Sequence, residues 1–174
     1  MTDNDIDADV VEVKVKNPLD GLPKSPMILD TCKKLFFDHK KLDTLNTFFD
    51  EFIKNFDSVG YSIYTANFKY NDDFSGRPSF VNNNSINGYI QNLDTAHKYA
   101  FGSFVLLKND ESTYELKSLW ILRGDQPIKE VMKDFIDYND WTKINPHKIT
   151  NELNDYFNAS HIDGKEVTIR AIYV

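Results

Sequence analysis

The sequence has a single cysteine, few glycines and no long apolar run. Cys32 is the only cysteine among 174 residues, so no disulfide can form within the chain. The seven glycines stand singly, which excludes the glycine-rich loop of nucleotide-binding proteins and the dinucleotide-binding fingerprint. No apolar run approaches the roughly 18 residues that a membrane-spanning helix needs. The sequence therefore predicts neither a P-loop protein nor a membrane-spanning one.

The chain also lacks an excess of positive charge. It carries 20 Lys and Arg against 27 Asp and Glu, a formal net charge of −7. Broad binding to phosphates needs clustered Lys and Arg, so nucleic acid is not the expected partner. The first residues are acidic where a signal peptide would be basic and then apolar, and we therefore expect a cytoplasmic protein.

Candidate catalytic and metal-binding residues are few. Cys32 and His39 lie seven residues apart, close to two helical turns, and could share a helix face. As a nucleophile, Cys32 would also need an electropositive pocket, for which only Lys33 and Lys34 are near in sequence. The other three histidines have no spacing typical of zinc ligands. We expect no enzyme activity, no cofactor and no metal site.

Apolar residues make up 41% of the chain and aromatic residues 14%, enough for one substantial core. Helical spacing predicts helices from Asp30 to about His39, from Thr44 to Phe56, after Ser85 as a cap, and after Asn145-Pro146. Alternating or continuous apolar patterns predict strands over 61–70, 100–108, 114–123, 135–143 and 166–174, although 135–143 is ambiguous. The predicted fold is α+β, an antiparallel sheet of about five strands flanked by α-helices.

Residues 1–16 differ in composition from the rest of the chain. They carry a net charge of −3 and too few large apolar groups to offset the entropy of ordering. We expect a flexible acidic tail or linker there, followed by one domain over 17–174.

The aromatic residues provide candidate contacts with a partner. Trp120 shares a strand face with Leu116 and Leu122, which favours a place in the core. Tyr, Trp and Arg gathered on one face would form a natural hot spot for binding. We select as candidate partner-contact residues Tyr61, Arg123, Tyr138 and Trp141.

Several segments, in this order, resemble the C-terminal domain of translation elongation factor 1-gamma. The resemblance covers roughly residues 17–157 and is carried by Asn17-Pro18-Leu19-Asp20, Gly60-Tyr61-Ser62-Ile63-Tyr64, Asn87-Gly88-Tyr89-Ile90-Gln91-Asn92-Leu93-Asp94, Trp120 to Gly124, and Tyr138 to Trp141. It implies a non-catalytic subunit of the cytosolic complex that exchanges GDP for GTP on elongation factor 1-alpha. Other subunits of that complex, or proteins associated with it, are the implied partners. The family's domain resembling glutathione transferases has no counterpart in this sequence, so we expect a fragment or a short form.

Two other functions stay open at this point. An RNA-contacting domain would need Lys33, Lys34, Lys40 and Lys41 to form one face beside aromatic side chains. An enzyme of unrecognised type would need a nucleophile with a base, or a metal set, which the sequence does not present.

Overall fold

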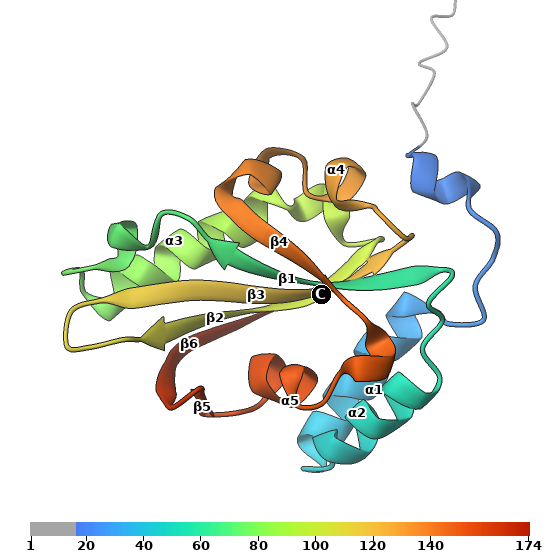
Figure 1. The fold of residues 1–174 in the computed structure, drawn as a ribbon, viewed down its shortest axis with the longest axis horizontal. Coiled ribbons are helices and arrows are strands. Elements are labelled where there is room, and N and C mark those ends of the chain that lie inside the picture. Colours follow the sequence, from blue (N-terminus) through green and yellow to red (C-terminus); the bar gives the residue numbers. More distant parts are fainter. Residues whose placement is uncertain (1–16) are drawn as a thin grey trace, which may run out of the picture.

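The structure, a computed structural model, describes residues 17–174 as an α+β fold in three layers (Figure 1). The tail predicted for residues 1–16 lies outside the described residues. A curled sheet lies between α1, α2 and α5 on one face and α3 and α4 on the other (Figure 1). The helices are α1 (Leu29–Lys41), α2 (Leu45–Lys54), α3 (Ser79–Asn92), α4 (Ile128–Val131) and α5 (Glu152–Phe157). No helix within 17–174 is both long and apolar enough to cross a membrane.

The sheet is antiparallel throughout and has six strands in the order β4-β1-β3-β2-β6-β5. They are β1 (Tyr61–Phe68), β2 (Ala100–Lys108), β3 (Tyr114–Arg123), β4 (Asn139–Ile144), β5 (His161–Ile162) and β6 (Lys165–Tyr173). The predicted fold class is confirmed, and the sixth strand is β5. Its two residues are too few to leave a periodic signal in the sequence.

β2 lies inside the sheet because its sequence is apolar on both faces. It pairs with β3 on one side and β6 on the other, and its residues from Ala100 to Leu107 are all buried. The connection to β3 is a short loop. In it, Asp110 Oδ1 accepts hydrogen bonds from the backbone N–H groups of Ser112 and Thr113, with N···O distances of 2.9 Å. Such local bonds favour a tight turn, and the turn joins β2 and β3 into a hairpin.

A first core fills the space between the sheet and α1, α2 and α5. Phe36 of α1 is fully buried, and its ring makes edge contacts with Phe48, Phe101 and Phe157 at centroid distances of 5.9, 5.5 and 5.3 Å. These three residues belong to α2, β2 and α5, so the Phe36 ring of α1 packs against three other elements. Edge-to-face geometry is the arrangement that aromatic pairs prefer.

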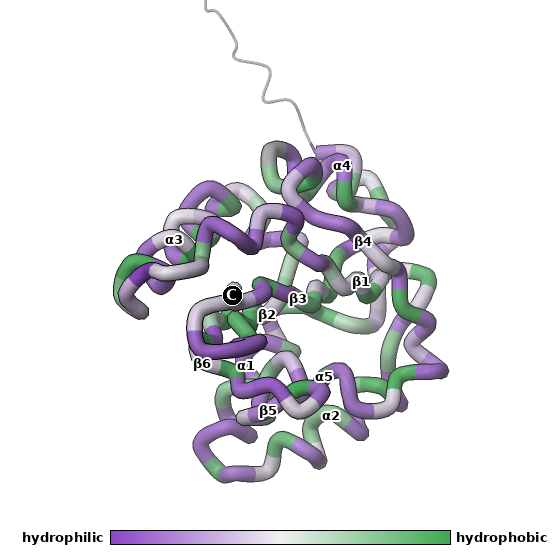
Figure 2. The backbone as a smooth tube through the Cα atoms, turned by 60° about the vertical axis from the view of Figure 1, so that its left-hand side comes forward, coloured by the Kyte–Doolittle hydropathy of each residue, from purple (hydrophilic) through white to green (hydrophobic). Residues whose placement is uncertain are grey.

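A second core lies on the opposite face, under α3, α4 and the 3₁₀ segment Lys133–Tyr138. Trp120 is fully buried there, as predicted, and contacts Phe104 and Tyr173 edge-on at 5.2 and 5.3 Å. Its Nε1 donates to the Ser118 hydroxyl at 2.8 Å, so the indole N–H is satisfied. In Figure 2, α3 is drawn mostly in purple and white, since this asparagine-rich helix offers the core few apolar groups.

The alternation of side chains along β6 is interrupted where its pairing with β2 shifts by one residue. Leu106 pairs with Ile169 and Leu107 with Val167, so Thr168 is the extra residue of a β-bulge. The strand pattern over 166–174 alternates and predicts one common face for Val167, Ile169, Ala171 and Tyr173, which is wrong for one of them. Val167 packs on the first core, whereas the other three lie against the second.

Other predicted boundaries need correction. Asp30 lies in the first turn of α1 and does not cap it, since the cap position is Ile28. α3 begins at Ser79, directly after Pro78, and Ser85 lies inside it with its hydroxyl bonded to Val81 O at 3.2 Å. A serine within a helix satisfies its hydroxyl on the preceding turn, and this alternative to capping leaves no mark in the sequence.

The region after β3 was the ambiguous part of the sequence, and it contains two elements in place of one strand. The predicted strand 135–143 divides into the 3₁₀ segment Lys133–Tyr138 and β4, because burial of Phe135 in the second core turns the chain. Asn145 does cap the following turn through His147 N at 2.9 Å, but the turn covers only Pro146–Lys148. The α-helix predicted there begins later, at Glu152.

Candidate partner-contact surface

The four candidate residues lie in two separate places. Tyr61 and Arg123 are direct neighbours across β1 and β3. Trp141 pairs with Ala66 farther along β1, and Tyr138 directly precedes β4. Tyr61 belongs to the first core and Trp141 packs against the second, so the structure does not gather the four on one face.

Arg123 fastens the leading segment, residues 17–28, to the end of the sheet. Its guanidinium donates to Gly60 O at 2.5 Å and to Pro23 O at 2.6 Å, and it lies 5.2 Å from the centre of the Tyr61 ring. Tyr61 is only 5% exposed, and this burial raises the pKa of its phenol. The pair therefore holds the fold together at this corner and offers a partner little of its own surface.

Gly60 and Asp57 complete the contacts between the leading segment and the start of β1. A Cβ on Gly60 would collide with Asp57 Oδ2 and the Arg123 guanidinium, so a larger residue there would have to displace these two charged groups. Ser25 donates its hydroxyl to Asp57 Oδ2 at 2.5 Å, and this bond is the main reason why the pKa of Asp57 is lowered. The leading segment is thus bonded at both Pro23 and Ser25.

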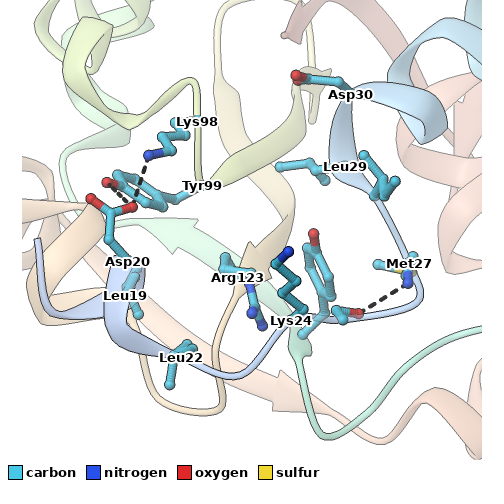
Figure 3. A pocket seen from close by; sticks show the side chains of 13 residues that line it. Leu19, Asp20, Leu22, Lys24, Met27, Leu29, Asp30, Lys98, Tyr99 and Arg123 are labelled. Carbon is cyan, nitrogen blue, oxygen red and sulfur yellow. Dashed lines mark hydrogen bonds and ion pairs between the residues drawn. The ribbon is translucent and has the colours of Figure 1, made fainter.

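A cavity of about 440 Å³ opens beside Arg123 (Figure 3). Its walls combine aliphatic side chains of the leading segment with Lys24, Lys98 and Arg123. Asp20 accepts hydrogen bonds from Lys98 Nζ and the Tyr99 hydroxyl, each at 2.9 Å, drawn as dashed lines in Figure 3. Asp20 thereby offsets part of the positive charge in this cavity.

Tyr138 takes part in an exposed aromatic cluster that the sequence did not reveal. Tyr70 is 51% exposed and Tyr138 43%, and their rings meet edge-on at 6.1 Å. Lys69 N donates to Tyr138 O at 2.9 Å, which holds the two chain segments together. We call Tyr70, Tyr138 and the half-buried Tyr89 the tyrosine surface. Tyr70 lies within the predicted strand 61–70, but β1 ends two residues earlier, at Phe68.

The tyrosine surface borders a hollow and rests on the second core. Tyr89 and Tyr138 line a cavity of about 540 Å³, together with Phe135 and the polar residues Asn92, Thr95 and Lys133. The Phe135 ring lies 5.7 Å from Tyr89 and 6.2 Å from Tyr138. The exposed ring of Tyr138 and the half-buried ring of Tyr89 therefore both rest on one buried ring.

Trp141 supports this surface more than it adds to it. The side chain is half-buried, its ring lies 6.4 Å from Phe135, and its Nε1 donates to Ile136 O at 2.9 Å. Both the ring and the polar atom are engaged within the domain. Trp141 thus fixes the 3₁₀ segment that carries Tyr138.

The candidate catalytic residues do not form an activated site. Burial raises the pKa of the Cys32 thiol, whereas a nucleophilic cysteine needs its pKa lowered. The His39 ring bonds the Thr44 hydroxyl through Nδ1 at 2.8 Å. Within residues 17–174, no three His, Cys, Asp or Glu side chains are placed to share a metal ion.

Comparison with known proteins assigns the family. The model of the elongation factor 1 gamma conserved domain matches residues 14–126, which is more than half of the chain. The candidate residues Tyr61 and Arg123 fall inside the matched range, and Tyr138 and Trp141 fall beyond it.

Curated relatives agree with this match. The chain is 39% identical over 137 residues to probable elongation factor 1-gamma 2 of Arabidopsis thaliana, which covers 75% of this chain and 31% of that protein. It is 39% identical over 138 residues to elongation factor 1-gamma of Prunus avium, with coverages of 75% and 31%. For elongation factor 1-gamma of Trypanosoma cruzi the identity is 32% over 135 residues, with coverages of 76% and 31%. The chain spans about a third of the length of these relatives, and by these matches it belongs to the elongation factor 1-gamma family.

Proposed function

We propose that the chain is a non-catalytic subunit or domain of the translation elongation factor 1 complex, acting in the cytoplasm as a protein-interaction module. Membership of the elongation factor 1-gamma family supports the assignment to this complex. The other subunits, or proteins associated with them, are the proposed partners. The tyrosine surface is the proposed contact, with Trp141 as its support.

One observation carries the choice of an interaction role: the two exposed rings of Tyr70 and Tyr138 are already ordered. Each makes a ring contact inside the domain, Tyr70 with Phe68 at 5.8 Å and Tyr138 with Phe135 at 6.2 Å. A tyrosine has few rotatable bonds, and a ring held before binding loses little entropy when a partner covers it. Exposed, pre-ordered tyrosines are typical of binding hot spots.

The RNA-contacting alternative is less well supported. Lys33 is half-buried and donates to His97 O at 2.7 Å, so its amine is engaged inside the domain. Lys34 and Lys41 lie seven residues apart on one side of α1, and Lys33 and Lys40 on another, since seven residues make nearly two turns. The two pairs therefore lie about 100° apart around the helix, and one of the four amines is already bonded within the domain.

The proposal is tested by affinity capture of the native chain with identification of its partners, followed by direct binding to the purified subunits. We expect subunits of elongation factor 1 among the captured proteins. The double variant Tyr70→Ala, Tyr138→Ala should reduce their yield at least fivefold. Val59→Ala is the matched control, because Val59 is 88% exposed and lies in the turn before β1.

Absence of these subunits from the captured proteins would overturn the assignment to the complex. Equal capture by the wild type and the tyrosine variant would instead overturn only the proposed contact surface. A non-catalytic role further requires that the purified chain alone does not accelerate GDP release from elongation factor 1-alpha.

A further inference from the structure

We infer that His97 is a pH-sensitive bridge, which holds the end of β6 against the turn after α3 when its imidazole ring carries two protons. His97 directly follows the 3₁₀ turn η3 (Asp94–Ala96), between α3 and β2. Its ring contacts Val174, which is 77 positions away in the sequence. We call the ring and its two hydrogen bonds the histidine bridge. None of the candidate partner-contact residues belongs to it, so this inference goes beyond the proposed function.

Both nitrogens of the His97 ring face hydrogen-bond acceptors. Nε2 lies 2.9 Å from Asp94 Oδ1, and Nδ1 bonds the main-chain oxygen of Val174. A carboxylate oxygen and a main-chain oxygen can only accept hydrogen bonds. A neutral imidazole has one N–H group, and its other nitrogen is itself an acceptor. The two bonds can therefore form together only when each ring nitrogen carries a proton.

Tyr173 provides a third contact that favours the charged form of the ring. The His97 and Tyr173 rings are stacked, with their centroids 4.7 Å apart and an interplanar angle of 4°. Tyr173 is fully buried, so water is kept from the ring face that it covers. The face of an aromatic ring attracts a cation, and a protonated imidazole over Tyr173 gains from this attraction.

The charged and titratable groups around the ring come from several elements. They are Asp94 of η3, Tyr173 of β6, Lys33 of α1 and, next in the sequence, Lys98. Lys33 opposes a second positive charge, but its Nζ is bonded to the carbonyl oxygen of His97 at 2.7 Å and not to the ring. Lys98 pairs with Asp20 at 2.9 Å, which offsets its charge. Asp94 is the one carboxylate bonded to the ring within the described residues, and it favours the proton on Nε2.

Loss of one proton breaks the bond to β6 and keeps the bond to η3. A histidine typically loses its second proton between about pH 5 and pH 8. The ionised Asp94 carboxylate retains the proton on Nε2, because a charged acceptor forms the stronger bond. Nδ1 then turns a lone pair toward the oxygen of Val174, and two acceptors repel each other. The bridge is thus complete at low pH and lost as the pH rises, whereas Tyr173 stays bonded to Leu93 O through its hydroxyl.

The test measures how firmly the end of β6 is held at two pH values. Amide hydrogen exchange of the whole chain is followed over residues 170–174 at about pH 5.5 and about pH 8, and each rate is divided by the intrinsic rate at that pH. We expect roughly fivefold greater protection at the lower pH, the effect of one hydrogen bond. His97→Gln should remove the difference, because glutamine does not titrate. His147→Gln, at an exposed histidine outside the bridge, should leave it unchanged.

A second variant and a spectroscopic measurement check the order of proton loss. Asp94→Asn removes the charge that retains the proton on Nε2, and it should reduce the pH difference in protection to less than about twofold. Nitrogen-15 spectra of the imidazole ring should show protons on both nitrogens at about pH 5.5 and on Nε2 alone at about pH 8. Melting curves of the variants show that they fold.

Each measurement can overturn the inference. Equal protection of residues 170–174 at the two pH values in the wild type would do so, and so would a pH difference that persists in His97→Gln. A ring that holds its remaining proton on Nδ1 at the higher pH would also contradict it, because the bond to Val174 would then survive. None of these readouts involves elongation factor 1 subunits, so this inference and the proposed function can fail separately.

Discussion

Gly102 of β2 lies directly opposite Trp120 of β3, and the indole occupies the space that a side chain on Gly102 would fill. A Cβ at position 102 would stand 2.5 Å from Trp120 Cε3 and 2.7 Å from Leu119 O. The second obstacle is backbone, which cannot rotate away. The missing side chain of Gly102 is thus what allows the largest residue of the second core to lie against the sheet.

Gly102→Ala should therefore destabilise the domain. Overpacking of a filled core costs about 1–3 kcal/mol, and chemical denaturation should show a loss in that range. Gly88→Ala is the control, since a Cβ there meets nothing within 4 Å and alanine favours the helix. An unchanged midpoint for Gly102→Ala would show that the indole can move. In the expected case of a loss, adding Trp120→Phe to Gly102→Ala should recover part of it, because the smaller ring vacates the space.

The two tryptophans should differ in what their removal costs. Trp120→Ala leaves a cavity in a sealed core and should cost about 3–5 kcal/mol. Trp141→Ala removes a half-buried ring and should cost about 1–2 kcal/mol, while loosening Tyr138 and lowering partner capture. Denaturation midpoints and capture yields of both variants check this. Equal destabilisation by the two would make Trp141 a core residue and nothing more.

Arg123→Met should release the leading segment without unfolding the sheet. It removes the bonds to Gly60 O and Pro23 O, and hydrogen bonds from a charged donor contribute about 1.5–3 kcal/mol. Hydrogen exchange should rise across residues 17–28 and stay slow in β2. Lys24→Met is the control, an exposed neighbouring cation (Figure 3) that makes neither bond. Unchanged exchange in the leading segment would show that other contacts hold it.

Stability should fall on the alkaline side through Tyr156. Burial raises the pKa of this phenol to about 12 from a usual value near 10, so the folded state binds the proton more tightly than the unfolded state. The free energy of unfolding that the protonated Tyr156 contributes is therefore fully present below about pH 10. It is lost as the pH rises toward 12. Tyr156→Phe should make stability fall less steeply across this window. The fall will not vanish, because burial also raises the pKa of Tyr173. An identical slope in wild type and variant would contradict the assignment.

Removal of residues 1–16 should leave stability nearly unchanged. Their composition offers little apolar surface to bury, and the apolar segments begin near Leu19. We expect the same melting temperature for the shortened chain; a loss of about 5 °C, near 2 kcal/mol for a domain of this size, would show that they contribute.

Strands with a strong pattern of apolar residues could be predicted from the sequence. β2 and β3 were placed at their observed bounds because long apolar runs end at turn residues, and Trp120 was assigned to the core from its neighbours on one face. The bulge at Thr168 could not be predicted, since it depends on which residue of β2 faces which residue of β6. The start of α3 was misplaced because Pro78 supplies it, whereas Ser85 only resembles a cap.

The candidate site was harder to predict because its residues are defined by distant contacts. Arg123 donates hydrogen bonds to carbonyl groups 63 and 100 positions away in the sequence. No local sequence pattern therefore shows that it holds the leading segment against the sheet. Tyr70 was missed because its exposure depends on where β1 ends. Tyr138 and Trp141 were both predicted as partner contacts from residue type, which fits the exposed Tyr138 and only in part the half-buried Trp141.

The bond between Arg123 and Pro23 also lies on the path by which tension on the leading segment reaches the sheet. β3 is bonded on both sides, to β1 and to β2. Tension applied at residue 17 reaches Pro23 before it reaches α1, and Arg123 transmits it to β3. This single hydrogen bond is far weaker than the two ladders of β3, so it breaks before either ladder is sheared. A neighbour tethered through the leading segment would thus detach that segment first and leave the sheet folded.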